Sequence, residues 1–150
     1  MPHRADLITD YMEVMAVLQR QVMPIRARSA ASVGLSRPQA EVLHLLSCRE
    51  TVSIKQIAEL LGITSSAATQ LTEGLVAMRC VERREDASDR RKVTVRLLPA
   101  GSTKVKALRE ASRASIEQLL EGLSDTEITE LLSVLRKLAH SCGADKDCIN

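Results

Sequence analysis

Apolar residues recur at steps of three and four along most of this chain, a spacing that predicts amphipathic helices rather than strands. The first helix spans residues 6–29, and Pro24 is expected to bend or break it near its end. The small residues that follow predict a loop. The same spacing predicts two helices near the other end, at about 100–122 and 125–142, the second opened by a capping box at Ser124. Most of the chain is therefore expected to be helical.

Three shorter helices are predicted between these, and each begins with a residue that can cap it. Ser36 and Ser53 both stand three residues before a glutamine, which is the pattern of a capping box. The helix after Ser53 is short, and Gly62 follows it in a place suited to a left-handed turn. Thr64 then caps a helix over residues 65–78. Two helices joined so tightly indicate a helix-turn-helix.

The pattern changes after the third of these helices. Apolar and polar side chains alternate over residues 93–97, which predicts a strand at 92–97, and residues 80–83 are expected to form its partner strand. The charged segment between them predicts a hairpin tip longer than a tight turn needs. A helix-turn-helix followed by a basic hairpin is the layout of a winged-helix DNA-binding domain. The predicted fold is therefore mainly α with a small β-hairpin wing.

Composition and charge narrow the classes of function. No apolar run approaches the roughly 20 residues of a membrane span, and the N-terminus lacks the apolar segment of a signal peptide. We therefore expect a cytoplasmic protein with no membrane contact and mostly reduced cysteines. Tyr11 is the only aromatic residue, which disfavours stacking on single-stranded bases. The net charge is only +2, but residues 79–96 hold seven basic groups against four acids, which favours a phosphate-binding face.

The helix at 65–78 carries small polar groups opposite its apolar stripe. This polar face, in which we include Thr72, has no long apolar side chain and could enter a major groove. The first turn also offers backbone amides to phosphate. Four residues are expected to face the groove: Ser65, Ser66, Thr69 and Gln70.

With the helix-turn-helix and the wing both in place, the chain resembles the MarR family of bacterial transcriptional regulators over nearly its whole length. The matching segments are the helix start at 38–43, the helix-turn-helix at 56–71, the wing motif at 84–91 and the strand-to-helix turn at 97–101. The resemblance implies a homodimer. Residues 1–35 and 100–150 would form a helical dimerisation region, and residues 36–99 a winged-helix DNA-binding domain.

The resemblance also implies a role for each wing charge. Asp89 is expected to hold a wing arginine in place through a charge-assisted hydrogen bond. Arg90 and Arg91 are expected to enter a narrow, A·T-rich minor groove. Arg84 and Lys92 are expected to contact phosphates or to support the others. The alternative is a solvated run of charge with no DNA contact.

One departure from the family pattern concerns the turn before the wing, where the family usually has glycine and this chain has Arg79 and Cys80. A thiol among arginines could have a lowered pKa and react with oxidants. One hypothesis is therefore a redox switch at Cys80 that shifts the wing, with Cys48 as a second candidate. The alternative is that Cys80 is a small buried hydrophobe.

Other chemistry finds little support in the sequence. His140, Cys142 and Cys148 supply only three soft ligands, so neither a metal nor a cofactor is predicted. Nucleophile sets, paired carboxylates and phosphate loops are missing from the sequence, so an enzyme is not expected. Family members respond to lipophilic ligands, oxidants or metals. The resemblance implies that a small-molecule effector would enter between the dimer helices and the DNA-binding lobe.

The terminal helices carry more apolar surface than one winged helix can cover. We expect self-association to bury it, in a two-fold dimer that fits two half-sites about one DNA turn apart. An intramolecular helical bundle is the alternative. The residues expected at this interface are Leu7, Tyr11, Leu18, Leu131, Leu135 and Leu138.

Together these features predict a homodimeric repressor that binds a palindromic double-stranded operator and leaves it on a ligand or redox signal. The alternative function is a winged-helix module for protein contact, without specific DNA binding. A steep salt dependence of duplex binding would distinguish the first from the second.

Overall fold

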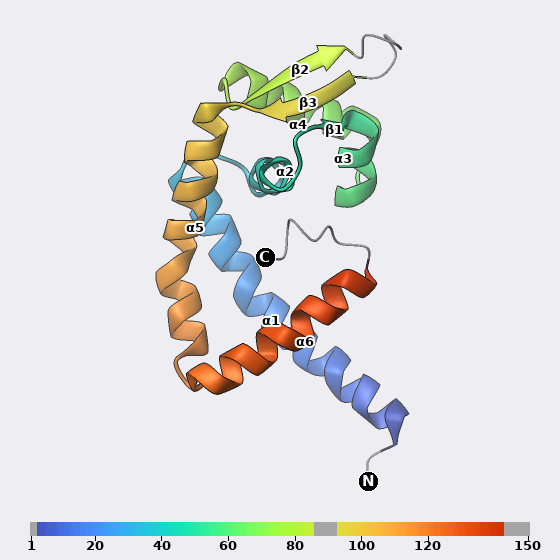
Figure 1. Cartoon of the computed structure of the whole chain (residues 1–150), viewed down its shortest axis with the longest axis vertical. Coiled ribbons are helices and arrows are strands. Elements are labelled where there is room, and N and C mark those ends of the chain that lie inside the picture. Colours follow the sequence, from blue (N-terminus) through green and yellow to red (C-terminus); the bar gives the residue numbers. More distant parts are fainter. Residues whose placement is uncertain (1–2, 86–92, 143–150) are drawn as a thin grey trace.

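The computed structural model describes residues 3–85 and 93–142, and it is mainly helical with one small sheet, which confirms the predicted fold class. In Figure 1 the sheet and three shorter helices form one lobe, from which three long helices extend. The elements in chain order are α1 (Arg4–Ser32), α2 (Arg37–Ser47), β1 (Val52–Ser53), α3 (Ile54–Leu61), α4 (Ser65–Ala77), β2 (Val81–Glu85), β3 (Val93–Leu97), α5 (Pro99–Leu120) and α6 (Asp125–Ser141).

Side-chain caps fix where most of these helices begin. The hydroxyls of Ser36 and Ser53 accept a hydrogen bond from the amide three residues on, and the glutamine there accepts one from the serine amide. Ser124 forms the same box with Glu127. Thr64 caps α4 by accepting from the Ala67 amide at 3.2 Å. The caps predicted from the sequence at these positions are confirmed.

The first helix differs from its prediction, because α1 continues from Arg4 to Ser32 although Pro24 lies inside it. Proline removes one backbone donor from a helix, but tertiary contacts hold the segment that follows. Ser29 and Ala30 are buried, and Ser29 accepts a hydrogen bond from the Ser112 hydroxyl of α5 at 2.9 Å. Packing against α5 outweighs the local penalty, so the loop predicted from residue 30 begins only after Ser32.

The sheet has three antiparallel strands in the order β1-β3-β2. β2 and β3 form the predicted hairpin, in which Val81 lies opposite Leu97. Their bounds are shifted relative to the prediction, since β2 begins at Val81 and continues to Glu85. β1 was not predicted, because two residues are too few to show alternation. It pairs Val52 with Val95 and so joins the wing to the segment that leads into α3.

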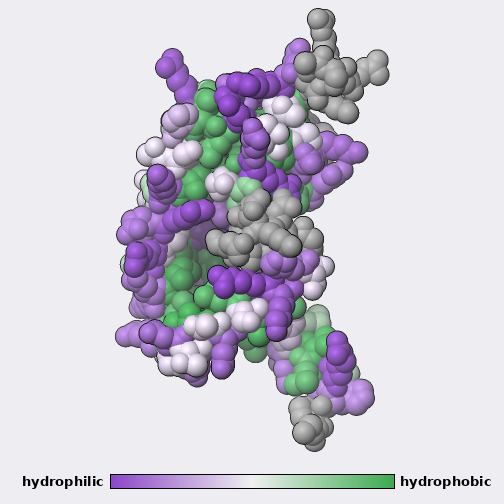
Figure 2. Space-filling model, viewed as in Figure 1, coloured by the Kyte–Doolittle hydropathy of each residue, from purple (hydrophilic) through white to green (hydrophobic). Residues whose placement is uncertain are grey.

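The core lies in the lobe, where α2, α3 and α4 pack with the sheet. Its largest fully buried side chains are Leu43, Ile57, Leu75, Val42, Val52, Val81, Val95, Thr72 and Cys80. The long helices are different: α6 has no buried residue. In Figure 2 hydrophobic atoms lie at the surface of the lower half of the molecule, where α1, α5 and α6 are found. Among the described residues, no helix is long and apolar enough to span a membrane.

Candidate nucleic-acid interface

The turn between α3 and α4 fixes the orientation of the second helix. Gly62 has a φ of 63° and a ψ of 35°, the left-handed conformation predicted for it. The Ile63 amide donates to the Ala58 carbonyl at 3.0 Å and closes the turn. Ala58 and Ala68 are buried where the two helices meet. The structure therefore contains the predicted helix-turn-helix, with α4 held by one face only.

The outer face of α4 is small and polar, as predicted, with one exception. Ser65, Ser66 and Gln70 are exposed, and Thr69 is partly exposed. Thr72 was assigned to this face, but its side chain is completely buried and its hydroxyl donates to the Ala68 carbonyl at 2.8 Å. The reason is geometric: the buried stripe of α4 is wide enough to include position 72 together with 68 and 75.

An ion pair connects α4 to the wing. The Arg83 guanidinium in β2 lies 3.6 Å from a carboxylate oxygen of Glu73 in α4. Arg83 and Val95 are register partners in the β2–β3 pair, so Arg83 stands on the sheet face that packs toward the lobe. The acid on the outer part of α4 thus has a local cation beside it, which offsets its repulsion of phosphate.

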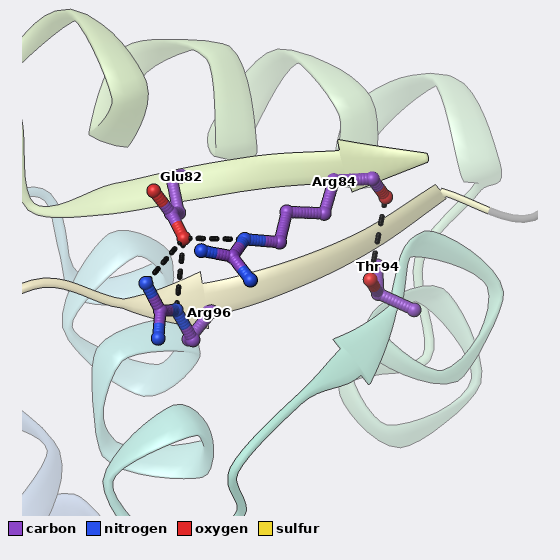
Figure 3. A network of polar contacts seen from close by, with 4 residues as sticks. All are labelled: Glu82, Arg84, Thr94 and Arg96. Atoms are coloured by element: carbon purple, nitrogen blue, oxygen red, sulfur yellow. Dashed lines mark hydrogen bonds and ion pairs between the residues drawn. The ribbon is translucent and has the colours of Figure 1, made fainter. Parts of the chain in front are cut away.

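The opposite face of the wing carries a second charge cluster, drawn in Figure 3. Glu82 and Arg96 are register partners, and one Glu82 carboxylate oxygen lies 2.6 Å from Arg96 Nη2 and 2.7 Å from Arg84 Nε. Hydrogen bonds from Arg96, together with the charge of Arg84, hold the pKa of Glu82 below its usual value. Glu82 therefore stays ionised and fixes two guanidinium groups on one surface.

Sequence reasoning missed Glu82 and Arg96. The signal that could have found them is the strand alternation itself, since pairing Val81 with Leu97 places positions 82, 84 and 96 on one face. Of the predicted wing residues, only Arg84 lies in the described part of the chain, where its side chain turns back toward Glu82. The others, Asp89, Arg90, Arg91 and Lys92, lie outside the described residues. Their roles remain predictions.

The turn between α4 and β2 adopts a glycine-like conformation without glycine. Arg79 has a φ of +53° and is the only non-glycine residue with positive φ in the described ranges. Its amide donates to the Val76 carbonyl at 2.8 Å, and the Cys80 amide donates to the Leu75 carbonyl at 2.9 Å. This pair of bonds is the Schellman motif that glycine usually completes. The departure from the family pattern at this position therefore places an arginine in a strained turn.

The environment of Cys80 contradicts the expectation of a lowered pKa. Its side chain is fully buried, and burial raises the pKa of the thiol in spite of the nearby Lys104. Cys80 thus fits the alternative of a small buried hydrophobe. Cys48 is partly exposed, and its Sγ donates to the His44 carbonyl.

A cleft of about 780 Å³ lies between the lobe and the long helices. Its apolar wall includes Leu60 and Leu61 from α3 and Leu108 from α5. His44 of α2 also lines it, and burial lowers the pKa of this imidazole, with a further contribution from Arg109 and Arg26. The remaining lining residues are Arg26, Ser29, Arg37, Ala40, Glu41, Leu45, Val105, Arg109, Glu110, Ser112, Arg113 and Ile116.

The residues predicted for dimerisation all expose their side chains. Tyr11 is 53% exposed and Leu135 is 45% exposed, although both are large and apolar. The remaining exposed members of the set are Leu7, Leu18, Leu131 and Leu138. Within residues 3–85 and 93–142 no group of three or more metal-ligating side chains comes together. Cys148 lies outside these ranges.

Comparison with known proteins shows which family this chain resembles. The MarR family model matches residues 33–92. The HTH-type transcriptional repressor MdtR of Bacillus subtilis is 23% identical over 140 residues, which span 93% of this chain and 90% of that protein. The HTH-type transcriptional regulator YfiV of the same organism is 33% identical over 108 residues, which span 70% of this chain and 68% of that protein.

Solved structures show the same fold. The transcriptional regulator BldR from Sulfolobus solfataricus superposes with a TM-score of 0.75 at 26% identity, covering 93% of this chain and 99% of that one. Wild-type MarR from Escherichia coli superposes with a TM-score of 0.72 at 20% identity, covering 92% of this chain and 97% of that one. The helix-turn-helix, the wing and these similarities lead to one conclusion: the chain belongs to the MarR family of winged-helix transcriptional regulators.

Proposed function

We propose that this regulator binds a palindromic duplex operator as a homodimer and represses transcription until a small molecule enters its cleft. The observation that carries the proposal is the outer face of α4, where Ser65, Ser66 and Gln70 are exposed on a helix whose other face is locked into the core. Such a helix can enter a major groove, and its hydroxyls and amide can bond to base edges. Arg84 and Arg96 supply cations on the outer face of the wing.

Dimerisation follows from the terminal helices. α6 has no buried residue, and α1 exposes Leu7, Tyr11 and Leu18, so both helices leave apolar surface of a kind that marks an interface. A two-fold dimer would bury it and present two copies of α4 to successive turns of DNA. Two-fold symmetry of the protein calls for a palindromic operator.

The cleft supports control by a ligand. It touches α3, the first helix of the helix-turn-helix, through Leu60 and Leu61, and α5 through Leu108. A molecule bound there would favour one placement of the lobe relative to the long helices, and would thereby change the spacing of the two recognition helices. Effector binding and operator binding would then oppose each other.

The chemistry of the cleft favours a lipophilic anion. Its apolar wall is aliphatic, and Arg37 is neutralised by Glu41 at 2.9 Å. In contrast, Arg26 and Arg109 form no hydrogen bond or ion pair with any described residue. Two cations with no ion pair to a described residue, beside an apolar wall, fit a ligand with an anionic head and an aliphatic body.

The deciding experiment is selection of bound duplexes from random DNA, followed by titration of the selected duplex against salt. We expect a common palindromic sequence and a steep loss of affinity as salt rises. Arg90→Ala and Arg91→Ala should each flatten the slope by about one unit of log affinity per log salt, whereas Lys137→Ala on α6 should not. A flat salt slope without any selected sequence would instead support a protein-interaction module.

The oligomeric state is tested separately by sedimentation. The unaltered protein should sediment as a dimer, and Leu131→Asp with Leu135→Asp should shift it toward monomer and abolish binding to a full palindrome. A monomer at all concentrations that still binds the palindrome would contradict the dimer.

A further inference from the structure

The hydroxyl of Thr69 is already engaged within its own helix. Thr69 Oγ1 donates to the Ser65 carbonyl oxygen one turn earlier, at 2.9 Å. A threonine hydroxyl has a single hydrogen, so this bond leaves it able to accept from a partner but not to donate. Thr69 is nevertheless only partly buried and lies on the surface that we propose for the major groove.

Its neighbours on α4 are different. The side chains of Ser65, Ser66 and Gln70 make no hydrogen bond to any residue that the structure describes. They remain able to donate as well as accept when DNA approaches. Among the four residues predicted to face the groove, Thr69 is therefore the one whose hydroxyl hydrogen is already engaged in a hydrogen bond within the protein.

The position of the hydroxyl also decides what Thr69 presents to DNA. Its oxygen is drawn against the backbone of the preceding turn, and the two branches of a threonine Cβ diverge at the tetrahedral angle. The Cγ2 methyl is consequently the branch directed away from that bond. In the major groove, guanine offers only acceptors and thymine offers an acceptor and a methyl group. A side chain that presents a methyl group and cannot donate a hydrogen bond is suited to contact the 5-methyl group of thymine.

We propose that Thr69 is a specificity-determining residue that reads thymine through contact between its Cγ2 methyl and the 5-methyl of the base. This inference rests on the proposed binding of α4 in the major groove. It adds a base identity to that proposal, namely a preference for thymine at the position under Thr69 in each half-site. A free donor at this position could instead bond to the acceptors of guanine, adenine or thymine, and would not single out thymine.

Thr72 provides a matched control within the same helix. It makes the same bond to the carbonyl four residues earlier, at 2.8 Å, but is completely buried. Thr72→Val removes a hydroxyl of the same kind without reaching the surface. A change in DNA affinity that substitutions at both positions cause reflects helix stability. A change that only substitutions at position 69 cause reflects base recognition.

The experiment uses the full-length protein and the duplex it selects, with deoxyuridine substituted for each thymine in turn. Deoxyuridine removes only the 5-methyl group. One thymine per half-site should show a loss of about fourfold in affinity on this substitution, the value for one apolar methyl contact. Thr69→Val, which keeps the methyl, should preserve that loss, and so should Thr72→Val. Thr69→Ser, which deletes the methyl, should bind thymine and deoxyuridine equally.

Other outcomes overturn the inference. If deoxyuridine has no effect at any position while the duplex is still selected, Thr69 does not read a methyl and the proposed function stands. If Thr69→Val loses the base preference and Thr69→Ser keeps it, the hydroxyl accepts from adenine or cytosine instead. If no duplex is selected at all, the inference and the proposed function both fail.

Discussion

Gly101 packs so closely against the carbonyl group of Cys80 that a Cβ at position 101 would collide with the backbone of the turn before β2. The first turn of α5 therefore lies directly on the turn that leads from α4 into the wing. Gly101→Ala should lower the free energy of unfolding by about 1–3 kcal/mol, because backbone atoms cannot yield as a side chain can. Urea unfolding followed by circular dichroism measures this. Gly122→Ala is the control, since nothing lies within 4 Å of that site.

A substitution at Arg79 should raise the free energy of unfolding instead of lowering it. Arg79→Gly relieves the cost of the left-handed conformation at φ +53°, and the gain exceeds the entropy that glycine loses on folding. We expect the free energy of unfolding to rise by about 0.5–1 kcal/mol. Gly34 closes the end of α1 with the same geometry at φ +72°, so Gly34→Ala should destabilise by a similar amount. Equal stability of Arg79→Gly and the unaltered protein would show that the turn carries no strain.

The buried imidazole of His44 predicts a loss of stability in mild acid. Its pKa in the folded protein lies below the ordinary value for histidine, mainly because of burial. Between the folded and unfolded pKa values the unfolded chain binds more protons, so the free energy of unfolding falls as pH drops through about 6.5 and levels off below the folded pKa. Urea midpoints across this pH range should show the decline. His44→Gln should remove the part of the decline that protonation of this imidazole causes.

Arg109→Gln offers a second test of the same cause. Since Arg109 is one of the two cations that lower the pKa of His44, its loss should raise that pKa and make the acid destabilisation smaller. An NMR titration of the His44 ring would detect the change directly. A ring pKa equal to that of an unfolded peptide, in the unaltered protein, would contradict the burial of this side chain.

The Glu82 cluster predicts a change in selectivity. Glu82→Gln releases Arg84 and Arg96 from their shared carboxylate and adds one unit of positive charge to the wing. Binding to random duplex should strengthen, and the ratio of affinities for the selected and random duplexes should fall. Glu117→Gln removes the same charge from an exposed pair with Arg113 on α5 and should leave the ratio unchanged. Competition titrations at two salt concentrations measure both variants.

Filling the cleft should separate effector response from DNA binding. Leu60 lines the cleft but is 53% exposed, so Leu60→Trp adds volume without disturbing the core. Decanoate is a suitable probe of an aliphatic anion, and decanol is its uncharged control. Decanoate should weaken duplex binding by the unaltered protein, decanol should act less, and Leu60→Trp should bind the duplex without responding. An equal response to both probes would exclude a role for Arg26 and Arg109.

Local signals made much of this fold predictable. Capping boxes at Ser36, Ser53 and Ser124, and the left-handed turn at Gly62, depend on a few adjacent residues and can be read directly. Features set by tertiary contacts could not be read in this way. The helix through Pro24 depends on packing against α5, and β1 exists only because Val52 pairs with Val95.

In the candidate site, too, features set by adjacent residues were predictable and features set by tertiary contacts were not. Ser65, Ser66 and Gln70 follow from helical periodicity, and the structure exposes them. Thr72 was misplaced because the width of a buried stripe depends on what packs against it. The burial of Cys80, which reverses the expected direction of its pKa shift, also depends on neighbours distant in sequence.

The pairing of β1 with β3 has a mechanical consequence. The strand that precedes the helix-turn-helix is hydrogen-bonded to the strand that follows the hairpin tip, and the Glu73–Arg83 ion pair closes the other side. The strand pairing and this ion pair thus connect the helix-turn-helix to strands β2 and β3. In the proposed complex, a joint shift of α4 and the hairpin would release the major-groove and minor-groove contacts together, so dissociation from a half-site should occur in one step.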